Sequence, residues 1–155
     1  MPTRADPPPE LRLARLRPNA VLPRYATAGA AGLDLSACLE EPLTLSPGDR
    51  VRVPTGWAIA LPPGHEGQVR PRSGLALRDG ITVLNSPGTI DEDYRGELQV
   101  LLVHLGDEPV TLRSGDRIAQ LVVAPVRTVR PTVLDEGEAL PPSGRGEGGF
   151  GSTGR

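Results

Sequence analysis

Glycine and proline punctuate this chain at short intervals from end to end. The 155 residues include 19 glycines and 18 prolines, and these are spread along the sequence rather than gathered in one segment. Because both residues interrupt helices, this spacing leaves little room for long ones and favours short strands joined by turns. The sequence therefore predicts a β-rich domain of the sandwich or barrel type.

Charge and cysteine content exclude several classes of protein. The net charge is -2 and every basic residue is an arginine, whereas a nucleic-acid groove normally needs a basic excess. Cys38 is the only cysteine, and His65 and His104 are far apart, so neither a disulfide framework nor a cysteine-based zinc site is expected. No apolar run could span a membrane, and the N-terminus lacks the apolar core of a signal peptide. We expect a cytoplasmic protein with no nucleic-acid or membrane partner.

Alternation of apolar and polar residues predicts about ten short strands. One short helix is expected from Ser73, a candidate N-cap, to Asp79, with Gly80 as its stop. The expected strands begin near Leu11 and continue at 33–37, 43–45, 50–53, 57–61, 65–69, 81–84, 97–105, 110–112, 117–123 and about 128–134.

The chain divides by composition into three parts. Residues 1–9 are proline-rich and predicted to be a disordered leader. Residues 10–135 carry the expected strands and form the domain. Residues 136–155 are glycine-rich and poor in core-forming side chains, and they are predicted to be a flexible arm. Composition alone favours a plain linker here, while an arm that orders on binding a ligand is the alternative.

The segment 85–98, NSPGTIDEDYRGEL, is the strongest candidate for a ligand site. Its first four residues carry turn signals and predict a tight hairpin between two extended segments. Asp91 and Tyr94 follow, so a carboxylate and an aromatic ring are placed to face a small ligand. Aspartates on loops also serve only to shape turns, and this stretch alone leaves both interpretations open.

Other polar residues stand out from their surroundings. Arg72 and Ser73 open the expected helix, where free amides and the helix dipole favour a phosphate, although an ordinary N-cap would look the same. Asp34 and Gln120 lie in otherwise apolar strands and need partners if they are buried. In the arm, glycines alternate with side chains that could wrap a phosphorylated ligand with a flat base, namely Arg145, Phe150, Ser152 and Thr153.

Five stretches, taken in order, resemble the motifs of the dUTPase family, the deoxyuridine triphosphate nucleotidohydrolases. They are AGLDLSA (31–37), PRSGLA (71–76), NSPGTIDEDYRGEL (85–98), DRIAQLVV (116–123) and GRGEGGFGSTG (144–154). The third and fifth are the most specific. The resemblance implies an all-β, distorted jelly roll with one short helix and a flexible C-terminal arm. It also implies a homotrimer whose three active sites are shared between subunits, each closed by an arm.

The reaction that the resemblance implies is hydrolysis of dUTP to dUMP and pyrophosphate. This reaction keeps uracil out of DNA and supplies dUMP for thymidylate synthesis. Water would attack the α-phosphate in line, assisted by Mg²⁺ that is held mainly by the three phosphates and water. Asp34 would reach that metal only through water.

The resemblance also assigns roles to single residues. Asp91 would be the catalytic base that positions and deprotonates the attacking water. Tyr94 would lie under the deoxyribose and exclude a 2′-hydroxyl. The remaining substrate-binding residues divide between base, phosphates and arm: Asn85, Thr89, Ile90 and Gln99 at the uracil; Arg72, Ser73, Gly74 and Gln120 at the phosphates; Arg145, Phe150, Gly151, Ser152 and Thr153 in the arm.

Two other functions remain open from the sequence. A dCTP deaminase of the same superfamily would share the fold, but deamination needs a carboxylate at the base, where this sequence offers amides and Asn85. A non-catalytic nucleotide-binding protein would also keep the fold, although Asp91 and the complete arm are present. Pyrophosphate release from dUTP and dCTP, assayed in parallel, separates the three.

Overall fold

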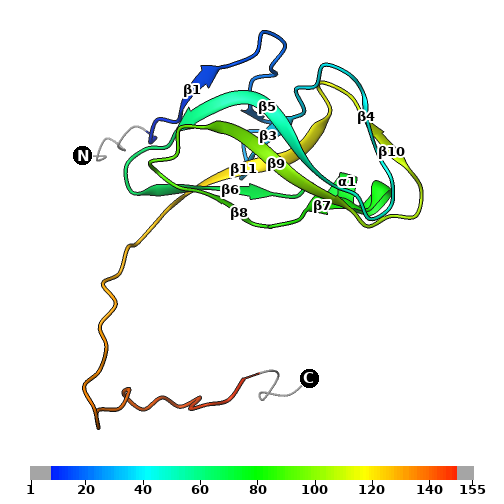
Figure 1. Ribbon diagram of the computed structural model, residues 1–155. Coiled ribbons are helices and arrows are strands. Elements are labelled where there is room, and N and C mark those ends of the chain that lie inside the picture. The colour runs from blue at the N-terminus through cyan, green and yellow to red at the C-terminus, as the bar shows by residue number, and fades with distance from the viewer. Residues whose placement is uncertain (1–7, 150–155) are drawn as a thin grey trace.

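Two β-sheets pack face to face in the computed structural model, which describes residues 8–149 (Figure 1). One sheet has the order β1-β5-β9-β7 and the other the order β2-β3-β11-β6-β8, with every pair antiparallel. β4 and β10 form a separate ribbon. The fold is the predicted jelly roll. Its elements are β1 Arg12–Arg15, β2 Arg24–Tyr25, β3 Leu33–Ser36, β4 Leu43–Leu45, β5 Arg50–Ala60, β6 His65–Arg70, α1 Ser73–Asp79, β7 Ile81–Val83, β8 Gly88–Ile90, β9 Glu97–His104, β10 Val110–Leu112 and β11 Arg117–Pro125.

The core lies between the two large sheets and follows the two-residue period of the strands. In β9, Leu98, Val100 and Leu102 are fully buried, while Gln99 and Leu101 between them are partly exposed. Side chains from both sheets and α1 complete one cluster. Burial of aliphatic side chains is the main stabilising term, at about 25 cal/mol per Å². The alternation holds from Glu97 to Leu102, whereas Val103 and His104 at the end of β9 are both buried as well.

The helix ends as predicted but begins differently. Gly80 adopts a left-handed conformation (φ 64°) and its N–H donates to the Ala76 carbonyl, which closes the C-terminus. The prediction of Ser73 as N-cap was wrong, because that position falls on Arg72, whose side chain makes no capping hydrogen bond. Arg72 instead binds Asp34. Within residues 8–149, no helix is long and apolar enough to cross a membrane.

Two other local predictions were wrong. The turn at 85–88 does not join a hairpin, because β7 pairs with β9 in one sheet and β8 pairs with β6 in the other. Turn residues fix a reversal but not the partner of each strand. The strand expected at 128–134 is absent, since regular structure ends at Pro125 and the segment 126–147 is exposed throughout. Apolar residues without a covering surface do not form a strand.

A bulge in β5 faces the start of β9. The register shifts between Pro54 and Ala58, so that three residues of β5 face Leu98 alone. Gly56, at the centre, has φ 75° and is buried, and a β-carbon there would stand 2.6 Å from Ala20 Cβ and 2.9 Å from Cys38 Sγ. The Cys38 thiol beside Gly56 is itself buried, and this burial raises its pKa. Only glycine combines this backbone conformation with this closeness.

Replacing Gly56 with alanine should therefore destabilise the fold more than the same change at Gly48. Gly48 also has positive φ (89°), but a β-carbon there meets nothing within 4 Å. We expect about 1 kcal/mol lost for Gly48→Ala, from the backbone alone, and at least about 2 kcal/mol for Gly56→Ala. Urea unfolding at fixed protein concentration, followed by fluorescence of the single tryptophan, Trp57, measures both. Equal losses would show that the contacts around Gly56 relax at no cost.

Candidate active site

Asp34 in β3 lies between two arginines from other segments. Its Oδ1 accepts Arg72 Nε at 3.1 Å and its Oδ2 accepts Arg117 Nη1 at 3.0 Å. The exposed fractions of the side chains are 17% for Asp34, 26% for Arg72 and 54% for Arg117. One carboxylate therefore neutralises part of a cluster that keeps a net positive charge, which suits a phosphate ligand.

Gln120 lies beside this cluster and finds the partner that its apolar surroundings require. It pairs across the sheet with Asp34 in β3 and Arg70 in β6, and its side-chain amide donates to the Pro71 carbonyl at 3.0 Å. Gly32 makes room for it, because a β-carbon at Gly32 would stand 2.7 Å from Gln120 Oε1. Gln120 thus fixes the backbone that leads into Arg72.

Arg117 is a site residue that sequence reasoning missed. It lines two surface pockets, of about 560 and 460 Å³, one shared with Asp34 and the other with Arg72 and Arg78. Arg117, at the start of β11, pairs with Ser36 of β3, and this pairing brings its side chain within reach of Asp34. The signal was present, since Arg117 lies in the fourth resemblance stretch, three residues before Gln120.

A bound metal would have to draw its ligands largely from the substrate. Among residues 8–149, no group of three or more His, Cys, Asp or Glu side chains is arranged to hold an ion. Asp34 is already engaged by Arg72 and Arg117. Mg²⁺ keeps several waters and is often held by one or two carboxylates together with phosphates. The carboxylate of Asp34 therefore fits a metal that brings phosphate ligands of its own.

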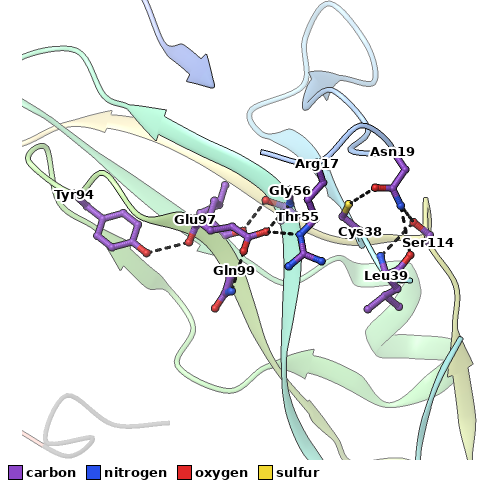
Figure 2. Close-up of polar contacts among 11 residues, drawn as sticks. Arg17, Asn19, Cys38, Leu39, Thr55, Gly56, Tyr94, Glu97, Gln99 and Ser114 are labelled. Atoms are coloured by element: carbon purple, nitrogen blue, oxygen red, sulfur yellow. Dashed lines mark hydrogen bonds and ion pairs between the residues drawn. The ribbon is translucent and has the colours of Figure 1, made fainter. Parts of the chain in front are cut away.

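The second group of candidate residues lies on the exposed turn between β8 and β9. Asp91 is exposed and its carbonyl accepts the Tyr94 N–H at 3.1 Å, which makes a tight turn. The Tyr94 hydroxyl donates to the Glu97 carbonyl at 2.9 Å (Figure 2). Arg95 secures the same turn through the Glu92 and Tyr94 carbonyls, at 2.7 and 2.8 Å. An exposed carboxylate thus stands next to a ring whose hydroxyl is anchored.

The preceding turn presents side chain and backbone from Asn85 to Ile90. Gly88 is buried against Val69, and its missing β-carbon leaves space for the Asn85 amide, which would be 3.2 Å away. Thr89 is exposed and Ile90 is half-buried. Gln99, in β9, donates to Glu97 Oε2 at 3.1 Å. These groups could read a flat base through amides and carbonyls.

Asp34 lies on a different part of the sheet from the turn residues, whereas Arg72 follows β6, the strand that pairs with β8. β8, which carries Thr89, is separated from β3, which carries Asp34, by β6 and β11. Three strand spacings amount to about 14 Å. Asp34, Arg72 and Arg117 form the arginine group. Ser73 and Gly74, both exposed at the start of α1, directly follow Arg72 and belong with this group.

The arm makes only local contacts in the part of it that the structure describes. Arg145 Nε donates to the Gly148 carbonyl at 2.7 Å, and residues 126–147 are exposed. Figure 1 shows this segment running away from the sheets. The predicted contributions of Phe150, Gly151, Ser152 and Thr153 lie outside the described residues.

Comparisons with known proteins agree with this fold and these motifs. The family model described as dUTPase matches residues 18–154. The deoxyuridine 5'-triphosphate nucleotidohydrolase of Anaeromyxobacter sp. (strain Fw109-5) is 60% identical over 144 residues, covering 93% of this chain and 95% of the relative. That of Desulfotalea psychrophila (strain LSv54 / DSM 12343) is 59% identical over 133 residues, covering 86% and 87%.

Solved structures show the same likeness. The dUTPase of Staphylococcus bacteriophage 80alpha with dUPNHPP has a TM-score of 0.84 and 26% identity, covering 94% of this chain and 99% of that one. The jelly roll and its pockets lined by Arg72 and Arg117 suit a protein that binds a phosphorylated ligand. With the family match and relatives at this identity, the chain belongs to the dUTPase family and is a dUTP diphosphatase.

Replacing Asp34 with asparagine should tighten the binding of pyrophosphate in the absence of metal. The amide keeps the shape of the side chain but removes the negative charge beside Arg72 and Arg117. We expect a gain of about fivefold in affinity at low ionic strength, since one partly screened charge is worth roughly 1 kcal/mol. Calorimetric titration in the presence of a chelator measures it, with Asp49→Asn as a control remote from the cluster. Unchanged or weaker binding would show that Asp34 does not set the charge of this site.

Proposed function

We propose that this chain hydrolyses dUTP to dUMP and pyrophosphate by Mg²⁺-assisted, in-line attack of water on the α-phosphate. Family membership supports the reaction. The observation that carries the mechanism is the separation of an arginine group around Asp34 from an exposed carboxylate, Asp91, on a rigid turn. In a cell this activity would keep uracil out of DNA and supply dUMP for thymidylate synthesis, in the cytoplasm.

The arginine group binds the phosphates in this proposal. Arg72 and the backbone of Ser73 and Gly74 hold the phosphate chain, and Gln120 lies near the α-phosphate. When bound, Mg²⁺ would neutralise charge on the triphosphate. Asp34 would hold a water of that metal while it restrains Arg72.

The turn group, which comprises the residues from Asn85 to Tyr94 on either side of and within β8, selects the nucleoside and activates water. Asp91 positions and deprotonates the attacking water; an ordinary carboxylate is a sufficient base where geometry and charge neutralisation lower most of the barrier. Tyr94 packs under the deoxyribose and excludes a 2′-hydroxyl. Uracil is read at its edge by Asn85 and the backbone at 89–90, with Gln99 nearby.

A complete site requires more than one chain, and we propose a homotrimer with three shared sites. The strand order places Asp34 in β3 about 14 Å from Thr89 in β8, and in this proposal the two halves of a site come from neighbouring subunits. Apart from the Val126 N–H, which donates to the Gly64 carbonyl at 2.8 Å, the described segment 126–147 makes only local hydrogen bonds. In a trimer it would carry Arg145 to a neighbour's phosphates, with Phe150 on the uracil and Gly151, Ser152 and Thr153 at the phosphates.

The alternatives raised by the sequence are less well supported. The matching relatives are nucleotidohydrolases rather than deaminases. The named activity of these relatives also favours an enzyme over a purely binding protein.

The unaltered protein should release pyrophosphate from dUTP far faster than from dCTP, UTP or dTTP. Asp91→Asn should lower kcat for dUTP by roughly 10²- to 10⁴-fold, the usual worth of a positioned general base, and leave dUTP affinity nearly unchanged. Steady-state pyrophosphate release and calorimetric binding of a non-hydrolysable analogue measure the two effects separately.

Asp93→Asn is the matched control, because Asp93 is exposed on the same turn and the charge change is identical. Its kcat should stay within about threefold of the unaltered protein, as expected for a surface charge. Near-normal turnover by Asp91→Asn, or an equal loss in both variants, would rule out Asp91 as the base.

A chain that ends at Leu140 should keep its fold and its assembly but hydrolyse dUTP at least about 10²-fold more slowly. Ordering a glycine-rich arm costs conformational entropy that only many ligand contacts can offset, and closure excludes water and aligns the phosphates. Phe150→Ala should cost less, about 1–3 kcal/mol, as for aromatic–base stacking. Light scattering checks the trimer, and pyrophosphate release checks turnover. Undiminished kcat in the shortened chain would make the arm a plain tail.

A further inference from the structure

The carboxylate of Glu97 is held by donors from three segments (Figure 2). Its Oε1 accepts the Gly56 N–H at 2.9 Å and lies 3.5 Å from Arg17 Nε, and its Oε2 accepts the Gln99 amide at 3.1 Å. Only 17% of this side chain is exposed. Moving such a carboxylate would leave a poorly solvated charge without partners, so its position is fixed.

These bonds close the sheet where the β5 bulge interrupts its pairing with β9. The Glu97–Gly56 bond ties the first residue of β9 to the centre of the bulge. Thr55, which is buried, donates its hydroxyl to the Leu98 carbonyl at 2.6 Å and secures the next residue. Side chains therefore replace the missing ladder bonds, and the residues on both sides of the Glu97–Leu98 peptide are held, Glu97 by its carboxylate and Leu98 by its carbonyl.

The carbonyl of that same peptide holds Tyr94. The phenol donates to it at 2.9 Å, and the ring lies against Gly96, where a β-carbon would clash with the ring. Tyr94 is otherwise 42% exposed. The hydroxyl anchor and the Gly96 contact consequently set where the ring stands.

We propose that Glu97 is a positioning residue for sugar selectivity, because its side chain, anchored on Gly56 and Arg17, fixes the carbonyl that orients the Tyr94 ring. This inference rests on the proposed role of Tyr94 under the deoxyribose. A ring that can tilt leaves room for a 2′-hydroxyl. Loosening Glu97 therefore lowers the preference for dUTP over UTP more than it lowers kcat for dUTP.

Two substitutions at Glu97 separate the hydrogen bond from the charge. Glu97→Ala removes every side-chain contact, whereas the amide oxygen of Glu97→Gln still accepts the Gly56 N–H. The ratio of kcat/KM for dUTP to that for UTP should fall about fivefold in Glu97→Ala, the usual worth of one hydrogen bond. It should stay within twofold in Glu97→Gln.

Tyr94→Phe removes the hydroxyl that donates to the Glu97 carbonyl and keeps the ring. It should lower the ratio about as much as Glu97→Ala does. If Glu97 acts through Tyr94, the double variant loses no more than the larger single loss, because the two changes break one chain of contacts. Fully additive losses would contradict the proposal.

A core change remote from the turn controls for stability. Leu45→Val in β4, where Leu45 is buried, should lower the urea midpoint of unfolding and leave the sugar ratio unchanged. If Glu97→Ala is destabilised but keeps its sugar ratio within twofold, the role of Glu97 is only structural and the proposal is overturned.

A readout without substrate distinguishes failure of this inference from failure of the proposed function. The chain has two tyrosines, so 3-fluorotyrosine labelling gives two ¹⁹F signals, and Tyr94→Phe identifies that of Tyr94. Glu97→Ala should shift and broaden the signal of Tyr94, and Glu97→Gln should not. An unchanged signal in Glu97→Ala overturns the positioning role whatever the activity. A shifted signal in a protein that does not prefer dUTP over UTP would instead reject the proposed role of Tyr94, and with it the selectivity part of this inference.

Discussion

The ion pairs of Asp34 join three segments that are far apart in the sequence. One carboxylate connects β3 to the residue before α1 and to the first residue of β11. Arg117 is more than half exposed, so its pair contributes less to stability than that of Arg72, whose exposed fraction is about half as large. The cluster matters more for position than for net stability. If Asp34 were removed, two guanidinium groups would repel each other at the point where α1 begins.

Missing β-carbons make room for polar side chains in both halves of the site. Gly32 admits the Gln120 amide, Gly88 admits the Asn85 amide, and Gly96 accepts the ring of Tyr94. Each glycine stands opposite a residue with a proposed contact to substrate. Close packing leaves no other space for such a side chain near the sheet surface. The positions of these glycines therefore shape the site as directly as the residues that face the ligand.

The sequence predicted the architecture and named most residues of the candidate site, because both depend on local patterns. Alternation identified β9 as a strand, and turn residues identified Gly80 and the segment 85–88. The errors share a cause, which is that pairing between strands is not a local property. The partners of β7 and β8, the absence of a strand after Pro125, and the contact of Arg117 with Asp34 all depend on which segments meet in three dimensions. Glu97 was overlooked for the same reason, since its importance comes from a bulge in a different strand.

The separation of the two halves follows from the sheet itself. The turn after β8 presents Asp91 and Tyr94 at that edge, whereas Asp34 lies three strands away in β3 and Arg72 follows β6. In the proposed trimer, association of copies would unite the two halves without changing the fold, because each chain would offer them to different neighbours. On this argument catalysis depends on assembly, since a chain that stayed alone would present phosphate-binding residues and a water-activating carboxylate to different regions of solvent.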